Sequence, residues 1–231
     1  MNNKTFYSNG KLLLTGEYVV LDGALSLAIP TIYGQSLIVE PIEDYKLIWK
    51  SFNLKGEIWF ESEFDLKNNE QLKQSRKLSG QQDKISDRLV QILNASKTLN
   101  PDFLNAKEGF KVTTKLDFPE NWGLGTSSTL INNIAQWAQI NPYQLLENTF
   151  GGSGYDIACA QHDTPITYQI KNNQPIVHAV NFNPSFKNHL FFVHLNKKQN
   201  SREGIKHYRE NKDNSKSRIK EIDAITLKMI N

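Results

Sequence analysis

The sequence has little of what several classes of protein require. Its 231 residues include one cysteine, Cys159, which excludes an internal disulfide and a metal site built from several cysteines. No apolar run approaches the roughly 18 residues that cross a bilayer, and the first residues show no signal-peptide pattern. We therefore expect a cytoplasmic protein with no membrane partner.

Excess charge is also scarce, with a net charge of +3. Much of that excess lies between residues 197 and 220, where Tyr208 is the only aromatic residue among the cations. A nucleic-acid-binding segment would interleave more aromatic residues with its cations or carry a known motif. We expect a solvated helix face there and no nucleic-acid partner.

What the sequence does contain is enough apolar material for a core, at 39% hydrophobic and 10% aromatic residues. Hydrophobic periodicity predicts a mixed α+β fold with a domain boundary near 184–188, which gives domains over 1–183 and 184–231. Strands are predicted over 11–15, 18–21, 36–41, 46–49, 57–64, 110–118, 166–170, 176–182 and 190–195. A long loop is predicted over 67–84, and helices over 83–99, 130–140, 142–149, from 151 to about 162, and 201–230.

The segment PENWGLGTSST (119–129) is the most informative one. Gly123 and Gly125 allow a tight turn and close approach of a ligand, and the helix that follows favours an anion at its start. The hydroxyls of residues 126–129 could reach phosphate oxygens or magnesium. The alternative is an ordinary helix start after a glycine turn. No Walker A pattern occurs in the chain.

Two further segments could carry chemistry. In GGSGYD (151–156), Asp156 could orient or deprotonate a substrate hydroxyl; alternatively, Ser153 caps a helix and Asp156 is a first-turn carboxylate. In SNGKLLLTGEY, Lys11 could be a positive charge at a site or an exposed strand position.

In this order, the three segments resemble the motifs of the GHMP superfamily of small-molecule kinases, named for galactose, homoserine, mevalonate and phosphomevalonate. NGKLLLTGEYVVLDGA (9–24) is similar to the first motif, PENWGLGTSST to the phosphate loop PxxxGLGSSAA, and SGYD (153–156) to the context of the catalytic aspartate. The string GYDIA is similar to a bacterial subgroup of the superfamily.

The resemblance implies roles for individual residues. Asp156 would act on the substrate hydroxyl, and Lys11 would stabilise the developing alkoxide. Ser127 and Glu147 would hold magnesium, although Glu147 could equally be an exposed helical glutamate. The phosphates of ATP would bind Gly123, Leu124, Gly125, Thr126, Ser127 and Ser128.

The resemblance also implies a fold: an N-terminal domain like the second domain of ribosomal protein S5, followed by a ferredoxin-like C-terminal domain. The glycine-rich motif that relatives carry in the C-terminal domain has no counterpart, because Gly204 is the last glycine. We therefore expect an incomplete, truncated ferredoxin-like domain over 184–231. Its apolar surface would be open to a partner chain, as in a homo-oligomer.

The function implied is an ATP- and magnesium-dependent kinase that phosphorylates a hydroxyl or phosphate of a small metabolite. Mevalonate and phosphomevalonate are the favoured acceptors, and GEY at 16–18 favours phosphomevalonate. The alternative is a shortened, catalytically weak relative that binds nucleotide or a protein partner without turnover.

Overall fold

The computed structural model describes residues 2–67, 72–74, 80–105, 108–195, 201–211 and 216–230. The chain forms two compact units, each built from three stretches of sequence. The first comprises Met1–Ser8, Tyr33–Pro119 and Thr126–Gly152, and the second Asn9–Ile32, Glu120–Gly125 and Ser153–Asn231. The mixture of helices with mostly antiparallel strands confirms the α+β class. The names of the predicted domains and their boundary near 184–188 stay predictions.

The first unit contains a sheet whose hydrogen-bonded order is β5-β4-β3-β6-β2. Within this order, only the pair of β3 and β6 is parallel. Strand β1 also pairs with β2. The strands are β1 (Lys4–Leu13), β2 (Ser26–Ile42), β3 (Lys46–Phe52), β4 (Ile58–Asp65), β5 (Lys73–Gln74) and β6 (Gly109–Leu116).

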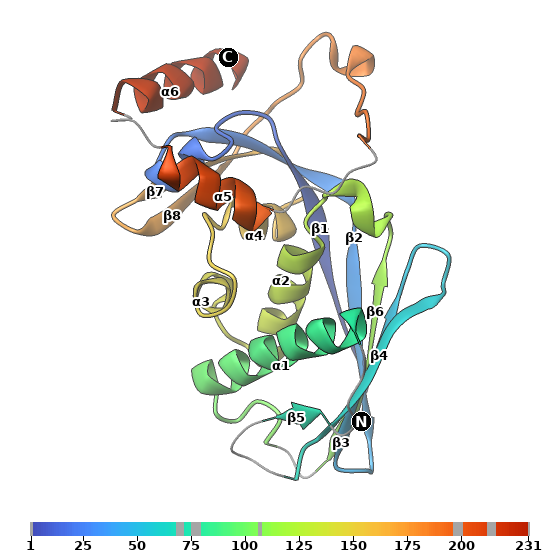
Figure 1. The fold of residues 1–231 in the computed structure, drawn as a ribbon. Coiled ribbons are helices and arrows are strands. Elements are labelled where there is room, and N and C mark those ends of the chain that lie inside the picture. The colour runs from blue at the N-terminus through green and yellow to red at the C-terminus, as the bar shows by residue number, and fades with distance from the viewer. Residues whose placement is uncertain are drawn as a thin grey trace. The chain divides into compact units, whose positions relative to one another are not determined.

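Strict alternation of buried and less buried residues separates the two faces of β3 and β4. Leu47 and Trp49 of β3 and Phe60 and Phe64 of β4 are all at most 2% exposed. Successive side chains of a strand point to opposite faces, so these residues share one apolar face. Helices α1 (Gln81–Leu99), α2 (Thr126–Ala138) and α3 (Pro142–Glu147) lie on one side of these strands (Figure 1).

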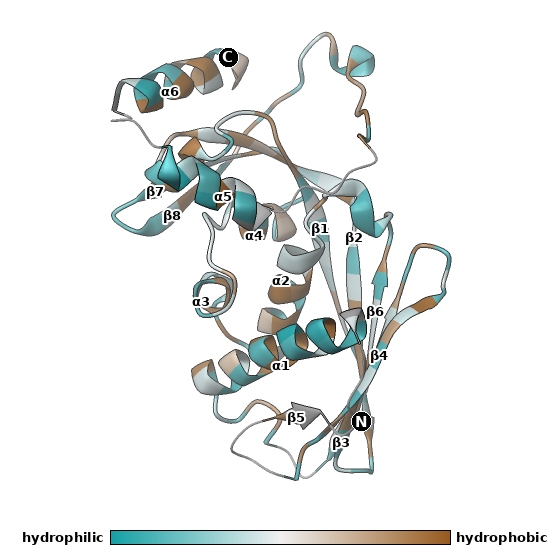
Figure 2. Cartoon of the chain, in the orientation of Figure 1, coloured by the Kyte–Doolittle hydropathy of each residue, from teal (hydrophilic) through white to brown (hydrophobic). Residues whose placement is uncertain are grey.

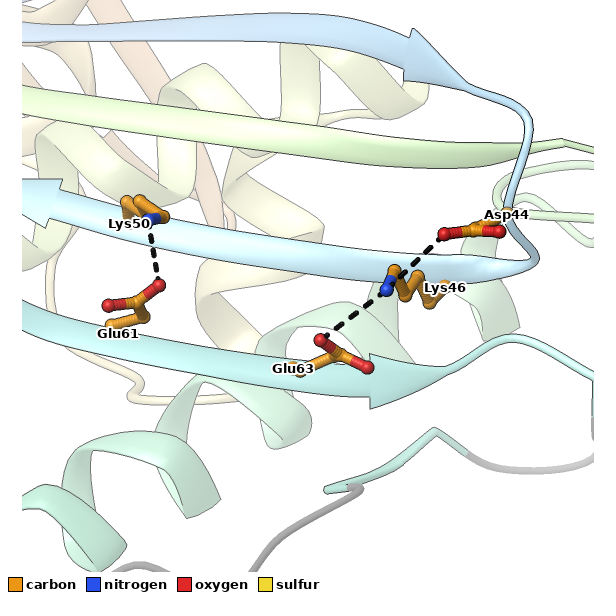
Figure 3. A network of polar contacts seen from close by, with 5 residues as sticks. All are labelled: Asp44, Lys46, Lys50, Glu61 and Glu63. Atoms are coloured by element: carbon orange, nitrogen blue, oxygen red, sulfur yellow. Dashed lines mark ion pairs between the residues drawn. The ribbon is translucent and has the colours of Figure 1, made fainter.

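The other face of β3 and β4 carries ion pairs (Figure 3). Lys50 pairs with Glu61, directly opposite, at 2.8 Å, and Lys46 lies 3.3 Å from Asp44 and 3.8 Å from Glu63. Each pair is partly exposed, so it contributes about 0–1 kcal/mol. These charges mark the solvent face of the sheet and contribute little to its stability.

A network of buried polar side chains joins α2 to β1 and β2. The Ser8 hydroxyl donates to Asn133 Oδ1 and accepts from Asn132 Nδ2, both at 2.8 Å. Asn133 Nδ2 donates to the carbonyl of Gln35, and the Thr129 hydroxyl donates to Gln35 Oε1, again at 2.8 Å. All five residues are at most 2% exposed, so each of these groups depends on its protein partner. In Figure 2, α2 shows more hydrophobic colour than the visible side of α1, in agreement with the burial of most residues of α2.

The second unit contains the antiparallel order β2-β7-β8 and several short helices. Its further elements are η1 (Val19–Asp22), η2 (Glu120–Trp122), α4 (Tyr155–Ala160), β7 (Ile166–Lys171), β8 (Gln174–Ala179), η3 (Lys187–His189), α5 (Ser201–Glu210) and α6 (Lys216–Ile230). No helix in the described ranges is long and apolar enough to cross a membrane.

Many predicted elements are confirmed. The strands predicted over 46–49, 57–64, 110–118, 166–170 and 176–182 correspond to β3, β4, β6, β7 and β8, and those over 11–15 and 36–41 fall largely within the longer β1 and β2. The cap at Asn141 is also confirmed, because its Oδ1 accepts from the N–H groups of Tyr143 at 2.8 Å and Gln144 at 3.3 Å. The predicted loop over 67–84 lies partly outside the described residues, and α1 begins within it at Gln81.

Four predictions are wrong. The helix predicted from 151 begins only at Tyr155, because Gly151, Gly152 and Gly154 before it have positive φ angles that an α-helix does not contain. Residues 18–21 form most of the 3₁₀ helix η1 instead of a strand, because a short buried apolar run does not distinguish the two. Helix α2 begins at Thr126, not at 130. Among the described residues no strand includes 190–195, where Phe191, Val193 and Leu195 are 80–81% exposed. Strand preference depends on packing against neighbours, which the described residues do not supply to this segment.

We predict that Asn133→Ala lowers the free energy of unfolding by roughly 1–3 kcal/mol, because the buried Ser8 hydroxyl loses its acceptor and the Gln35 carbonyl loses the amide donor of Asn133. Denaturant unfolding measures this change. The matched control is Gln136→Ala, an exposed position on the same helix, where a change within about 0.5 kcal/mol is expected. Equal effects at the two positions would contradict a stabilising role for the network.

Candidate active site

Lys11 connects the first predicted motif to the glycine loop through its backbone. The N–H of Lys11, near the end of β1, donates to the carbonyl of Leu124 at 3.0 Å. Leu124 is only 6% exposed, so its buried side chain anchors the loop at the same point. Two segments that are more than a hundred residues apart in sequence therefore meet within the second unit.

The side chain of Lys11 reaches the third segment. Its Nζ lies 5.3 Å from the ring centroid of Tyr155, within the range of a cation–π interaction. Tyr155 is the first residue of α4, and Asp156 is the second. Helix α4 begins after Gly154, whose φ of 83° is a left-handed conformation that glycine adopts without strain. The structure thus brings Lys11 to the start of the helix that carries Asp156.

The charges of Lys11 and Asp156 act on common neighbours. The pKa of the Cys159 thiol is raised to about 12, mainly by burial and to a smaller extent by the Asp156 carboxylate, while Lys11 acts in the opposite direction. Burial also raises the pKa of Tyr155 well above 10, with smaller contributions from the carboxylates of Asp156 and Glu17. Tyr155 and Cys159 therefore stay neutral near pH 7, and neither can serve as a base. The carboxylates of Asp156 and Glu17 are the groups near Tyr155 that can accept a proton, and Asp156 is the one that follows Tyr155 on α4.

Asp156 is held by its own helix. Its Oδ1 accepts from the N–H of Ile157 at 3.0 Å, and a first-turn carboxylate is stabilised by the helix dipole. The alternative in which Ser153 caps this helix is wrong, because Gly154 occupies the cap position and makes no side-chain cap. The carbonyl of Ser153 accepts a hydrogen bond from the Tyr168 hydroxyl instead.

The glycine loop has the backbone that its sequence predicts. Gly123 and Gly125 have φ angles of 75° and 91°, a region that other residues rarely adopt. Nothing lies within 4 Å of the position that a Cβ would take at Gly123, so the constraint there is conformational and the space in front of the loop is open. Helix α2 begins directly after Gly125, at Thr126.

The four hydroxyls after the loop belong to the first unit and differ in exposure. Ser127 is exposed and Thr126 half-buried, whereas Ser128 is 3% exposed and Thr129 fully buried. The Thr129 hydroxyl donates a hydrogen bond to Gln35 within the buried polar network. It therefore contributes to the core and does not face a ligand. Ser127 is the hydroxyl presented to solvent.

Glu147 is an exposed residue at the end of α3, also in the first unit. Within the described ranges, no three His, Cys, Asp or Glu side chains gather where they could hold a metal ion. A magnesium ion at such a site would take most of its ligands from water and phosphate oxygens, as this ion usually does. The roles of Ser127 and Glu147 in metal binding therefore stay predictions.

Sequence reasoning did not single out Tyr155 or Glu17, which lie beside the two predicted catalytic residues. An available signal was the aromatic residue immediately before Asp156. Trp122 is 43% exposed, and its ring centroid lies 6.5 Å from that of His194.

The raised pKa of Cys159 leads to a prediction about its reactivity. We expect an aromatic disulfide reagent to label the folded protein at pH 8 at least ~100-fold more slowly than the guanidinium-unfolded protein, because the thiolate is the nucleophile. The labelling rate should increase as the pH rises toward 12. Similar rates for the folded and unfolded chains at pH 8 would show that the thiol is accessible and unperturbed.

No family model and no curated protein matches this sequence. Solved structures do match. Methanococcus jannaschii mevalonate kinase gives a TM-score of 0.65 at 16% identity, over 100% of this chain and 74% of that one. Streptococcus pneumoniae phosphomevalonate kinase, in complex with phosphomevalonate and AMPPNP, gives a TM-score of 0.61 at 14% identity. The match covers 98% of this chain and 73% of that one. Lactococcus lactis galactokinase, complexed with galactose, gives 0.56 at 19% identity over 79% of this chain, which spans only 48% of that enzyme. The chain has the fold of the GHMP-family kinases.

Proposed function

We propose that this protein is an ATP- and magnesium-dependent kinase that phosphorylates a hydroxyl or phosphate of a small metabolite, with mevalonate and phosphomevalonate as the favoured acceptors. The observation that carries the proposal is the cluster of Lys11, Tyr155 and Asp156 beside the Leu124 loop. The fold shared with mevalonate, phosphomevalonate and galactose kinases supports it.

The residues present fit a nucleotide. The left-handed glycines and the open space at Gly123 leave the loop backbone accessible to phosphate oxygens, and the start of α2 follows with the exposed Ser127. In the proposal, residues 123–128 hold the phosphates, and Ser127 and Glu147 contribute to magnesium binding. Bound magnesium-ATP supplies the phosphoryl group and the charge that balances its oxygens.

Asp156 and Lys11 act on the acceptor. The Asp156 carboxylate accepts the proton of the acceptor hydroxyl, and the ammonium of Lys11 stabilises the negative charge that develops on that oxygen. The face of the Tyr155 ring holds the ammonium in place without neutralising it. The N–H of Ile157 orients the carboxylate.

We predict that Asp156→Asn lowers kcat by roughly 10²–10⁴-fold with a hydroxyl acceptor, because it removes the general base. The KM for ATP should change little. A phosphate acceptor is largely ionised at pH 7, because its second pKa is about 6, and it needs no base to remove a proton. With such an acceptor, the decrease of kcat in Asp156→Asn should therefore be smaller. ADP release from magnesium-ATP, with mevalonate, phosphomevalonate, homoserine and galactose offered separately, measures both quantities.

Turnover with one acceptor, lost in Asp156→Asn, would establish the kinase and identify its substrate. Retained turnover in the variant would exclude Asp156 as the base. A folded protein that turns over none of the acceptors would favour the second candidate, a relative that binds nucleotide or a protein partner without catalysis. The exposed apolar side chains of residues 190–195 favour binding of a protein partner in this second candidate function. The partner could be another protein or a second copy of this chain.

A separate prediction concerns Ser127. We expect Ser127→Ala to weaken binding of ATP in the presence of magnesium by about tenfold and to leave its binding in EDTA unchanged, because the hydroxyl would be a ligand of the metal and is therefore missed only when magnesium is bound. Titration calorimetry with and without magnesium measures this difference. Gln136→Ala, exposed further along the same helix, is the control. An equal loss with and without magnesium would contradict a role in metal binding.

A further inference from the structure

The two C-terminal helices, labelled α5 and α6 in Figure 1, hold the segment that follows Lys11. This segment, residues 14–25, connects β1 to β2 and contains η1. We call it the post-lysine loop. It belongs to the second unit, as do both helices.

Helix α6 binds both ends of the post-lysine loop. The carboxylate of Asp223 accepts from the N–H of Leu25 at 2.7 Å, and the Thr226 hydroxyl donates to the carbonyl of Leu25 at 2.9 Å. Thr226 Oγ1 also lies 2.7 Å from the hydroxyl of Thr15, which accepts from the N–H of Leu27 at 2.8 Å. Thr226 is fully buried and Thr15 is 9% exposed, so these polar groups depend on one another.

Helix α5 binds the middle of the post-lysine loop. The ring of Tyr208 stacks on that of Tyr18, with centroids 5.7 Å apart and planes 19° apart, and the Tyr208 hydroxyl donates to Asp22 at 2.5 Å. Gly204 lies against the same ring, because a Cβ at this position would overlap the Tyr18 hydroxyl. Only glycine allows α5 to approach Tyr18 this closely.

The post-lysine loop needs such support. Tyr18 has a φ of 60°, a left-handed conformation that is unfavourable for a bulky side chain and persists where surrounding contacts impose it. Beside the stacked rings, a cavity of about 550 Å³ is lined by Tyr18, Glu203, Gly204, His207, Tyr208 and Asn211. Gly204 and Tyr208 lie one helical turn apart on α5, so both contacts with Tyr18 come from the same side of this helix.

The post-lysine loop also adjoins the candidate catalytic cluster. Glu17 and Tyr18 both contribute to the raised pKa of Tyr155, which places them within electrostatic reach of its phenol. Tyr155 in turn contacts the ammonium of Lys11, three residues before the loop begins. A displacement of the loop would therefore move the backbone next to Lys11 and the neighbours of Tyr155 together.

We propose that α5 and α6 act as a clamp on the post-lysine loop, and that Gly204, Tyr208, Asp223 and Thr226 are positioning residues for Lys11. Their importance for turnover rests on the proposed kinase function. Their effect on the position of Lys11 does not, and it can be measured without any substrate.

The test follows the Lys11 ammonium directly. Lysines are dimethylated with ¹³C, which keeps their charge, and the signal of Lys11 is assigned by its absence in Lys11→Arg. The Tyr155 ring should shift this signal upfield of the exposed lysines. We expect Gly204→Ala and Asp223→Ala to remove most of that shift. Arg209→Ala on α5 and Glu221→Ala on α6, both exposed, should leave it unchanged.

Tyr208→Phe provides a milder variant if Gly204→Ala fails to fold, because it keeps the stacked ring and removes only the bond to Asp22. In kinetics, the clamp variants should lower kcat by about tenfold or more through misplacement of Lys11, with the KM for ATP within twofold of wild type. An unchanged Lys11 signal in folded Asp223→Ala and Tyr208→Phe would overturn the clamp. If the wild-type protein turns over no acceptor, the kinase proposal fails. The ¹³C signal of Lys11 in the variants still shows whether α5 and α6 position this lysine.

Discussion

The structure of the candidate site depends on how the end of β1 is held. There the backbone of Lys11 donates to Leu124, while its ammonium lies over Tyr155, so one residue joins segments near positions 11, 124 and 155. The register of a strand decides which face each side chain takes, and a shift by one residue would point Lys11 away from α4. Ser8, on the same strand, is bound by Asn132 and Asn133 in the core, which opposes such a shift.

The electrostatics of the cluster leave its carboxylates as the groups that can act as bases. Lys11 and Asp156 carry opposite charges and influence the same thiol, while Tyr155 and Cys159 have raised pKa values and remain neutral. Opposite charges in one environment reduce the cost of desolvation for each other. In the proposed function, the Asp156 carboxylate and the Lys11 ammonium suit transfer to a hydroxyl, in which a proton leaves and negative charge develops on the same oxygen.

Hydrogen bonds from residues distant in sequence hold the post-lysine loop in the second unit. Backbone hydrogen bonds within residues 14–25 and to Leu27 shape the post-lysine loop, and side chains about two hundred residues away attach to it: Tyr208 at Asp22, and Asp223 and Thr226 at Leu25. Gly204 has no special backbone requirement in α5; it is needed because Tyr18 occupies the space of its side chain. Such a requirement arises from tertiary contact, and no local pattern reveals it.

Features that arise from local chemistry could be predicted from the amino-acid sequence. Alternation placed β3 and β4, Asn141 capped α3 before Pro142, and Gly123 and Gly125 indicated a left-handed loop. Features that depend on neighbours distant in sequence became visible in the folded chain. It made 19–22 a 3₁₀ helix, turned Thr129 toward the core and left 190–195 without a strand among the described residues. It also placed Tyr155 under Lys11. Turns, caps and periodicity are properties of a few consecutive residues, whereas these outcomes depend on which surfaces meet when the chain folds.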